Sequence, residues 1–249
     1  MPTRKPNPSR GRLETKSRGA APRTLCIDIG GTGIKAMILD SAGKPLTERA
    51  RVDTPRPATP RAVLAAIQGL VKDLSSFDRV AVGFPGVVRR GVTETAWNLH
   101  PKWIDVDLAK ALEKALGRPV RAANDADVQG LAVVRGRGVE LVVTLGTGFG
   151  SALFVDGTLV PNVQLGHHLG WRKKTFEEDL GDRALRKAGR KKWNRRLEHA
   201  ILDLETLFNY DVLYLGGGNA TKVRLELPRN VKIVENVAGL LGGIALWRD

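Results

Sequence analysis

Two segments of this 249-residue chain repeat one pattern: an apolar run, a turn of small residues, a second apolar run and an aspartate. Residues 27–40 (IDIGGTGIKAMILD) align without a gap on residues 143–156 (VTLGTGFGSALFVD) after a shift of 116 positions. Only three aligned positions are identical, so the evidence for the repeat is the shared pattern and not sequence identity. Apolar runs joined by glycine turns indicate β-hairpins. The repeat therefore predicts two lobes of similar topology, each opening with a glycine hairpin.

Helical and extended patterns alternate along the rest of the chain, which predicts an α/β fold. Short apolar runs such as RVAVGFPGVV and DVLYLGGGNA have the composition of buried strands. Apolar residues at helical spacing, together with start and stop signals, predict the helices. The expected helices cover 60–76, 106–116, 126–135, 175–208 and 236–247.

Three glycine-rich turns follow strand-like runs, at residues 28–32, 145–148 and 215–219. Glycine lets backbone N–H groups approach an anion closely, and threonine adds a hydroxyl donor. None of the turns has the G-K-[ST] ending of a P-loop, and none is a G-x-G-x-x-G of a βαβ unit. Two glycine hairpins facing one cleft would form a phosphate clamp. Such a clamp is suited to phosphoryl transfer, which also needs a carboxylate to take a proton from the acceptor hydroxyl.

The positive charge of the chain is concentrated in two segments. The net charge is +14, from 40 basic and 26 acidic residues. Residues 1–23 carry seven basic groups and one acid, and residues 172–196 carry eleven basic groups and four acids. A polyanionic partner is expected for the second segment. The first is rich in Pro, Gly and Ser and is expected to be a disordered basic tail.

Composition excludes several classes of protein. No run of about 18 apolar residues is present, so no membrane span is expected. The single cysteine, Cys26, can form neither an internal disulfide nor a multi-cysteine zinc site. No apolar stretch of the signal-peptide type precedes residue 24. A cytoplasmic setting is the simplest expectation.

The motifs, taken in order, resemble those of a known family. DIGGTGIKAMILD resembles the first phosphate motif of the sugar kinase/actin/Hsp70 fold. GFPGVV, NDADVQGLAVVRG, LGTGFGSALFVDG and LVPNVQLGHHLG then follow in the order of the ROK family of sugar kinases. The resemblance covers about residues 24–249. The short C-terminal half, without a cysteine zinc cluster, is most similar to the polyphosphate glucokinase group.

The resemblance implies a two-lobed α/β fold of the actin/Hsp70/hexokinase-like (ribonuclease H-like) type, with a central cleft. Residues 24–123 would form the N-terminal lobe, completed by a closing helix at 236–249. Residues 124–235 would form the C-terminal lobe, with the second phosphate loop, the sugar histidine and the basic helices.

Asp125 matches the catalytic base, which accepts the proton of the sugar 6-hydroxyl. The residues that match or border the sugar pocket are Asn124, His167, Gln164, Asn98, Pro85 and Gly86. The family usually has Glu where this chain has Gln164. An amide keeps one acceptor oxygen but loses the charge of a carboxylate. The affinity for the sugar, the anomer that is bound and the identity of the sugar therefore stay open.

Other motif residues match the donor side of the cleft. Asp28 matches an acid associated with the metal, which is expected to be Mg2+ because that ion favours a carboxylate, waters and phosphate oxygens. The matching phosphate-binding residues are Asp28, Gly30, Gly31, Thr32, Lys35, Gly146, Thr147, Gly148, Gly216, Gly217 and Gly218.

The resemblance implies a glucokinase that uses polyphosphate and/or ATP. The alternatives are an ATP-dependent kinase for mannose, fructose or an N-acetylhexosamine, and an inactive sugar or polyanion binder. A transcriptional regulator of the ROK type is not expected, because a 23-residue Pro-rich tail cannot form a winged helix-turn-helix. No membrane partner is expected, and no nucleic acid beyond the basic tail. A homodimer is common among relatives and stays open here.

Overall fold

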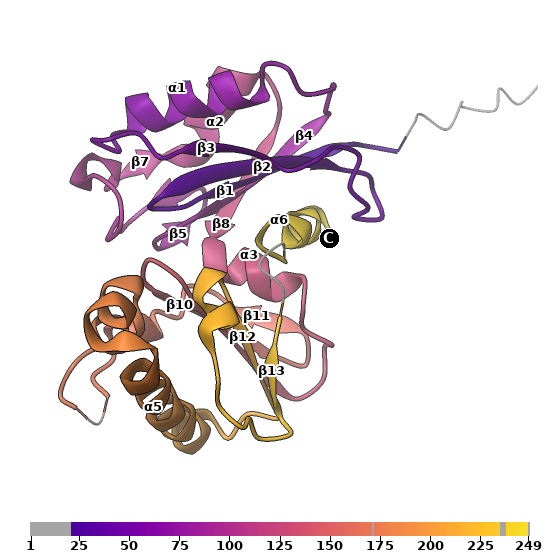
Figure 1. The fold of residues 1–249 in the computed structure, drawn as a ribbon. Helices are drawn as coiled ribbons and strands as arrows, with labels where there is room; N and C mark the ends of the chain where they lie inside the picture. Colours follow the sequence, from indigo (N-terminus) through magenta and orange to yellow (C-terminus); the bar gives the residue numbers. More distant parts are fainter. Residues whose placement is uncertain (1–20, 171, 235–237, 249) are drawn as a thin grey trace, which may run out of the picture.

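The computed structural model describes residues 21–170, 172–234 and 238–248, which form two lobes on either side of a short helix (Figure 1). Most of the expected disordered tail lies outside the described residues, as do residues 236, 237 and 249 of the expected closing helix. Within the described ranges, no helix has both the length and the apolar character that crossing a bilayer requires.

The N-terminal lobe contains a five-stranded sheet in the order β3-β2-β1-β4-β8. Its strands are β1 (Thr24–Ile29), β2 (Gly33–Leu39), β3 (Ala50–Asp53), β4 (Arg79–Phe84) and β8 (Val120–Asn124). β1 and β2 form an antiparallel hairpin, and β4 runs parallel to β1. A small sheet beside it, absent from the sequence expectation, contains β5 (Val88–Arg89), β6 (Val92–Thr93) and β7 (Val106–Asp107).

The C-terminal lobe contains a second five-stranded sheet in the order β11-β10-β9-β12-β13. Its strands are β9 (Val139–Leu145), β10 (Phe149–Val155), β11 (Thr158–Val160), β12 (Val212–Gly216) and β13 (Val231–Ile233). β9 and β10 pair antiparallel, and β12 runs parallel to β9. The two sheets therefore share one strand order and direction, as the sequence repeat predicts. The fold class is confirmed.

Helices with local start and stop signals cover the N-terminal sheet. α1 (Pro60–Val71) begins where the Thr59 side chain accepts a hydrogen bond from the N–H of Ala62. α2 (Leu108–Leu116) ends at Gly117, whose positive φ of 67° suits glycine. Buried residues four positions apart on α1, such as Val63 and Ile67, pack on the sheet.

The basic segment is not the continuous helix that 175–208 predicts. α4 (Phe176–Leu180) begins with a capping box of Thr175 and Glu178, and Gly181 separates it from α5 (Asp182–Phe208). α5 is itself kinked at Gly189, where φ is 74°. Glycines without helical backbone geometry explain both breaks. Buried residues of α5, including Trp193 and Leu197, pack on the C-terminal sheet.

α3 (Asp125–Leu131) lies between the lobes, because it starts where β8 of the N-terminal sheet ends and packs on the C-terminal sheet. The last described segment, α6 (Ala238–Leu241) and the 3-10 turn η4 (Gly242–Trp247), contacts α3 and the N-terminal strands (Figure 1). A methyl group built on Gly243 would lie 2.7 Å from Sγ of Cys26, so glycine permits this close approach.

Candidate active site

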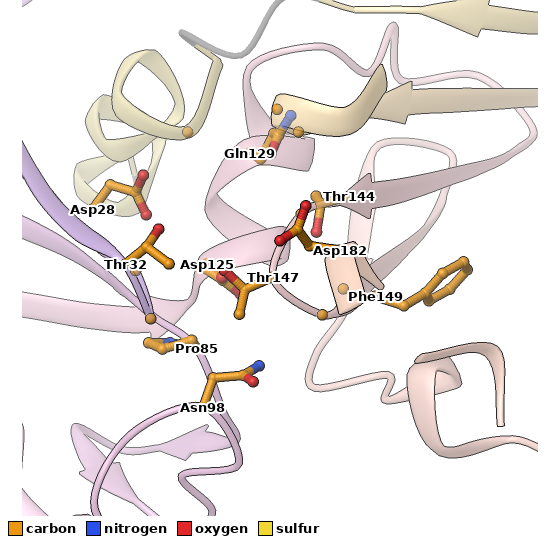
Figure 2. A pocket seen from close by; sticks show the side chains of 18 of the residues that line it. Asp28, Thr32, Pro85, Asn98, Asp125, Gln129, Thr144, Thr147, Phe149 and Asp182 are labelled. Carbon is orange, nitrogen blue, oxygen red and sulfur yellow. The ribbon is translucent and has the colours of Figure 1, made fainter. Parts of the chain in front are cut away.

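A cleft of about 410 Å³ lies between the lobes and is lined by residues from both (Figure 2). The structure brings most of the expected site residues to this cleft, although they are spread over nearly 200 positions of sequence. Those that line it are Asp28, Gly30, Gly31, Thr32, Lys35, Pro85, Gly86, Asn98, Asn124, Asp125, Gly146, Thr147, Gly148, Gln164, His167, Gly217 and Gly218. Gly216 does not line the cleft and instead packs against the side-chain amide of Gln129.

The first glycine turn joins β1 to β2 and closes with a hydrogen bond from the N–H of Gly30 to the carbonyl of Gly33, at 3.0 Å. The Thr54 hydroxyl donates to the Gly30 carbonyl at 2.6 Å and fixes the turn from outside. Within the described chain, the N–H groups of Gly31 and Thr32 donate to no other group. They are therefore available to an anion in the cleft.

The second glycine turn joins β9 to β10 and lies beside the first. It closes with a 3.1 Å hydrogen bond from the N–H of Gly146 to the carbonyl of Gly148. A methyl group built on Gly31 would lie 3.5 Å from Cγ2 of Thr147, so the two turns nearly touch. Asn98 packs against both, because methyl groups on Gly31 and Gly148 would meet its side chain at 3.3 and 3.0 Å. Asn98, expected at the sugar pocket, therefore lies beside both glycine turns.

Asp28 and Lys35 form an ion pair at the edge of the first turn. They are direct partners in the β1–β2 register, so both side chains lie on the same face of the hairpin. Nζ of Lys35 lies 2.8 Å from Oδ2 of Asp28, and both side chains are about one fifth exposed. The pair places one negative and one positive group beside the free N–H groups of the turn.

Asp125 is the first residue of α3 and points into the cleft between the two turns (Figure 2). The preceding Asn124 caps the helix, because its Oδ1 accepts from the N–H groups of Ala126 and Asp127. Burial and the negative charge of Asp28 raise the pKa of Asp125 to about 7, although the Ala126 N–H donates to its carboxylate. A carboxyl with a pKa near neutrality is suited to accept and release a proton.

The remaining expected sugar residues line the same cleft from both lobes. Nδ2 of Asn124 donates to the carbonyl of Gly86 at 3.0 Å, which ties α3 to the Pro85–Gly86 turn. Gln164 and His167 belong to the loop and 3-10 turn η2 (Leu165–His167) of the other lobe. The His167 ring lies 4.4 Å from the ring of Trp97, an exposed residue of the N-terminal lobe.

The third glycine loop connects β12 to the 3-10 turn η3 (Gly218–Lys222). Gly217 has φ of 83°, and a side chain there would clash with the backbone of Leu145, so only glycine fits. Nδ2 of Asn219 donates to the carbonyl of Gly146 at 3.2 Å. The third loop is thereby fixed to the second glycine turn.

Comparison with known proteins decides the family. Residues 24–171 match the ROK family. The chain belongs to the ROK family. It is 34% identical over 233 residues to a polyphosphate glucokinase of Mycobacterium tuberculosis, covering 87% of this chain and 88% of the relative.

Solved structures agree with this membership. The inorganic polyphosphate/ATP-glucomannokinase of Arthrobacter sp. strain KM superposes with a TM-score of 0.83 at 37% identity, over 91% of this chain and all of that one. A ROK family glucokinase of Streptomyces griseus, solved with glucose and AMPPNP, gives a TM-score of 0.76 over 90% of this chain and 98% of that one. Its identity of 21% supports the fold alone.

Several residues of the ROK cleft were not predicted from the sequence. They are Arg51, Trp97, Gln129, Thr144, Phe149, Glu177 and Asp182. Gln129 lies one helical turn after Asp125, so helical spacing could have identified it. Glu177 and Asp182 come from the basic segment 172–196, where eleven basic residues outnumber four acids and neither acid belongs to a recognised motif. The N–H of Asp182 donates to the carbonyl of Gly146 at 2.9 Å, which holds the start of α5 at the cleft.

The acids of the cleft fit a magnesium ion that is shared with a substrate. Among residues 21–170, 172–234 and 238–248, no cluster of three or more His, Cys, Asp or Glu side chains could hold a metal by itself. Magnesium, however, needs only one or two carboxylates when phosphate oxygens and waters complete its shell. Asp28 lies close enough to Asp125 for its negative charge to contribute to the raised pKa of Asp125. A cation between them would relieve that repulsion.

Proposed function

We propose that this chain is a glucokinase that transfers a phosphoryl group from polyphosphate or ATP to the 6-hydroxyl of glucose. The observation that carries the proposal is the position of Asp125, whose carboxyl, with a pKa of about 7, lies between two glycine turns with free N–H groups. The names of the relatives at 34% and 37% identity support the same activity.

The acceptor hydroxyl would be held within reach of Asp125. As the sugar oxygen attacks the terminal phosphorus, its proton passes to the Asp125 carboxylate, and the bond from phosphorus to the donor's bridging oxygen breaks. The free N–H groups of Gly31, Thr32, Thr147 and Gly148 donate to the phosphoryl oxygens. Closure of the cleft would exclude water, which otherwise competes as the acceptor.

Mg2+ is the cofactor of this proposal. Asp28 would hold it, with Asp125 nearby, and phosphate oxygens and waters would supply the other ligands. When bound, the ion neutralises negative charge on the donor. Lys35, already paired with Asp28 at 2.8 Å, supplies a second positive charge at the same end of the cleft.

A basic surface on α5 would bind the polyphosphate chain. We define this surface by the exposed cations Arg183, Arg186, Lys187, Arg190, Lys191, Lys192 and Arg195. It begins next to Asp182, which lines the cleft. A polyphosphate whose terminal group lies at the glycine turns could therefore continue along α5. Binding to such a surface depends strongly on salt, because it releases counterions.

The acceptor is glucose, with mannose as the second candidate. We call the part of the cleft lined by Gly86, Gln164 and His167 the sugar end. There the amide of Gln164 can donate to and accept from hydroxyl groups. An uncharged side chain at this position makes weaker hydrogen bonds to sugar hydroxyls than a carboxylate does. The relative from Arthrobacter is named for both sugars.

The test is to measure formation of glucose 6-phosphate by purified protein with Mg2+, in parallel reactions with long-chain polyphosphate and with ATP. Each reaction is repeated with mannose in place of glucose. Product with glucose and either donor supports the proposal. If neither sugar is phosphorylated with either donor, the kinase assignment is refuted.

A further inference from the structure

Asn162 joins the two lobes through its side chain. It lies in the loop between β11 of the C-terminal sheet and η2. Its Oδ1 accepts a hydrogen bond from the N–H of Val88 at 3.0 Å, and its Nδ2 donates to the Val88 carbonyl at 3.1 Å. Val88 belongs to β5 of the N-terminal lobe. One amide side chain thus pairs with both backbone groups of a residue 74 positions away.

The backbone of Asn162 is fixed as well. Its N–H donates to Oδ2 of Asp127 on α3, at 3.2 Å. Asp127 is 2% exposed, and within the described residues its other oxygen, Oδ1, has no hydrogen-bond partner. Asn162 also has φ of 61°, a left-handed conformation that asparagine and glycine tolerate best. The residue therefore contacts β5 and the helix that begins with Asp125 at once.

Asn162 is close in sequence to the side chains of the sugar end. Gln164 follows two positions later and His167 five positions later. The segment between them is held from within the C-terminal lobe, because the Ser151 hydroxyl donates to the Val163 carbonyl at 2.6 Å and accepts from the Leu165 N–H at 3.0 Å.

Val88 is close in sequence to the opposite wall of the cleft. Gly86, two positions earlier, lines the sugar end, and its carbonyl accepts from Asn124. The Asn162–Val88 contact consequently connects the Gly86 turn of one lobe to the loop that carries Gln164 in the other. The two hydrogen bonds between Asn162 and Val88 therefore hold the two sides of the sugar end at a fixed separation.

We propose that Asn162 is a positioning residue that sets the width of the sugar end of the cleft by fixing the Gln164 loop to β5. This inference rests on the proposed function. Asn162 does not itself line the cleft and acts through Gln164 and His167. The described hydrogen bonds of Asn162 go to Val88 and Asp127, and none goes to the glycine turns or α5, which form the donor end.

The test compares substitutions that separate side-chain bonding from backbone conformation. Asn162→Gly removes both hydrogen bonds to Val88 and keeps a residue that accepts positive φ. Asn162→Asp keeps an acceptor for the Val88 N–H but loses the donor to its carbonyl. Asn209→Gly is the matched control, because Asn209 also has positive φ, at 46°, but lies at the end of α5, away from the cleft.

We expect Asn162→Gly to raise KM for glucose about tenfold, the size expected for two lost neutral hydrogen bonds. KM for the phosphoryl donor should stay within about twofold, since the donor end is unaffected. Asn162→Asp should give an intermediate rise, and Asn209→Gly none. If KM for glucose is unchanged in Asn162→Gly, or if both KM values rise together, the positioning role is overturned.

A second measurement, on the proteins without ligand, does not depend on catalysis. Hydrogen exchange at the Val88 amide should be about tenfold faster in Asn162→Gly than in the wild type or in Asn209→Gly. Unchanged exchange would overturn the proposed contact. Absence of sugar phosphorylation by the wild type would instead refute the proposed function, so the two failures are distinguishable.

Discussion

The ionisation of Asp125 sets an acid limit for the proposed reaction. Burial and the charge of Asp28 raise its pKa from 3.8 to about 7. Only the ionised carboxylate can accept the proton of the sugar hydroxyl. We therefore expect kcat/KM for glucose to fall as the pH drops through about 7, to about one tenth of its plateau at pH 6 and about one hundredth at pH 5.

The same shift implies that ionised Asp125 destabilises the fold. Because the folded-state pKa is raised, the neutral carboxyl is favoured in the native protein, and stability is lost as the pH rises from about 4 to about 7. A shift of roughly three pH units corresponds to at most about 4 kcal/mol. Asp125 is partly exposed in the cleft, and solvent screening reduces this to about 1–2 kcal/mol.

Asp125→Asn should therefore stabilise the protein at pH 8, with a rise in Tm of roughly 2–6 °C. The gain should be much smaller at pH 4, where the wild-type carboxyl is neutral in the folded state and only about half ionised in the unfolded state. Calorimetric unfolding at the two pH values measures it, with Asp73→Asn as the control, because Asp73 is exposed on the surface. An acid limit of activity near pH 4, together with no stabilisation by Asp125→Asn, would refute the reasoning.

Three further predictions concern the two ends of the cleft. Gln164→Glu should lower KM for glucose about three- to tenfold, because a charged acceptor makes stronger hydrogen bonds to hydroxyls; no change with glucose or mannose would place residue 164 outside the sugar site. Replacing Lys191, Lys192 and Arg195 together by Gln should raise KM for long-chain polyphosphate about tenfold or more at low salt and leave KM for ATP within about twofold; equal effects on both donors would contradict the polyphosphate surface. Trp97→Ala should raise KM for glucose about five- to tenfold, whereas Trp97→Phe keeps a ring against His167 and should retain most of the affinity; equal effects of the two substitutions would exclude a role for the aromatic ring.

The sequence predicted the parts of the fold that depend on local pattern. The 116-residue repeat anticipated two sheets with the same strand order, because each lobe begins with the same hairpin. The glycine turns at residues 30–33 and 146–148 were recognisable, since each interrupts an apolar strand with residues that allow close backbone approach. Asp125 and His167 were placed through their motifs and lie in the cleft.

Features that depend on contacts distant in sequence were not predicted. The pairing of Asn162 with Val88 crosses 74 positions and leaves no periodic signal in either segment. Asp182 reaches the cleft because Gly181 separates α4 from α5, and the helical pattern of residues 175–208 does not indicate where that break falls. Strands of two residues, such as β5, are too short for an alternating pattern to be visible.

The turnover of Asp125→Asn tests the central claim most directly. Initial rates of glucose 6-phosphate formation are measured at pH 8 with Mg2+ and long-chain polyphosphate, and glucose binding to both proteins is measured by calorimetry. We expect kcat to fall about 100- to 10,000-fold while Kd for glucose stays within about threefold of the wild type. Near-wild-type turnover by Asp125→Asn would contradict the assignment of this carboxylate as the base.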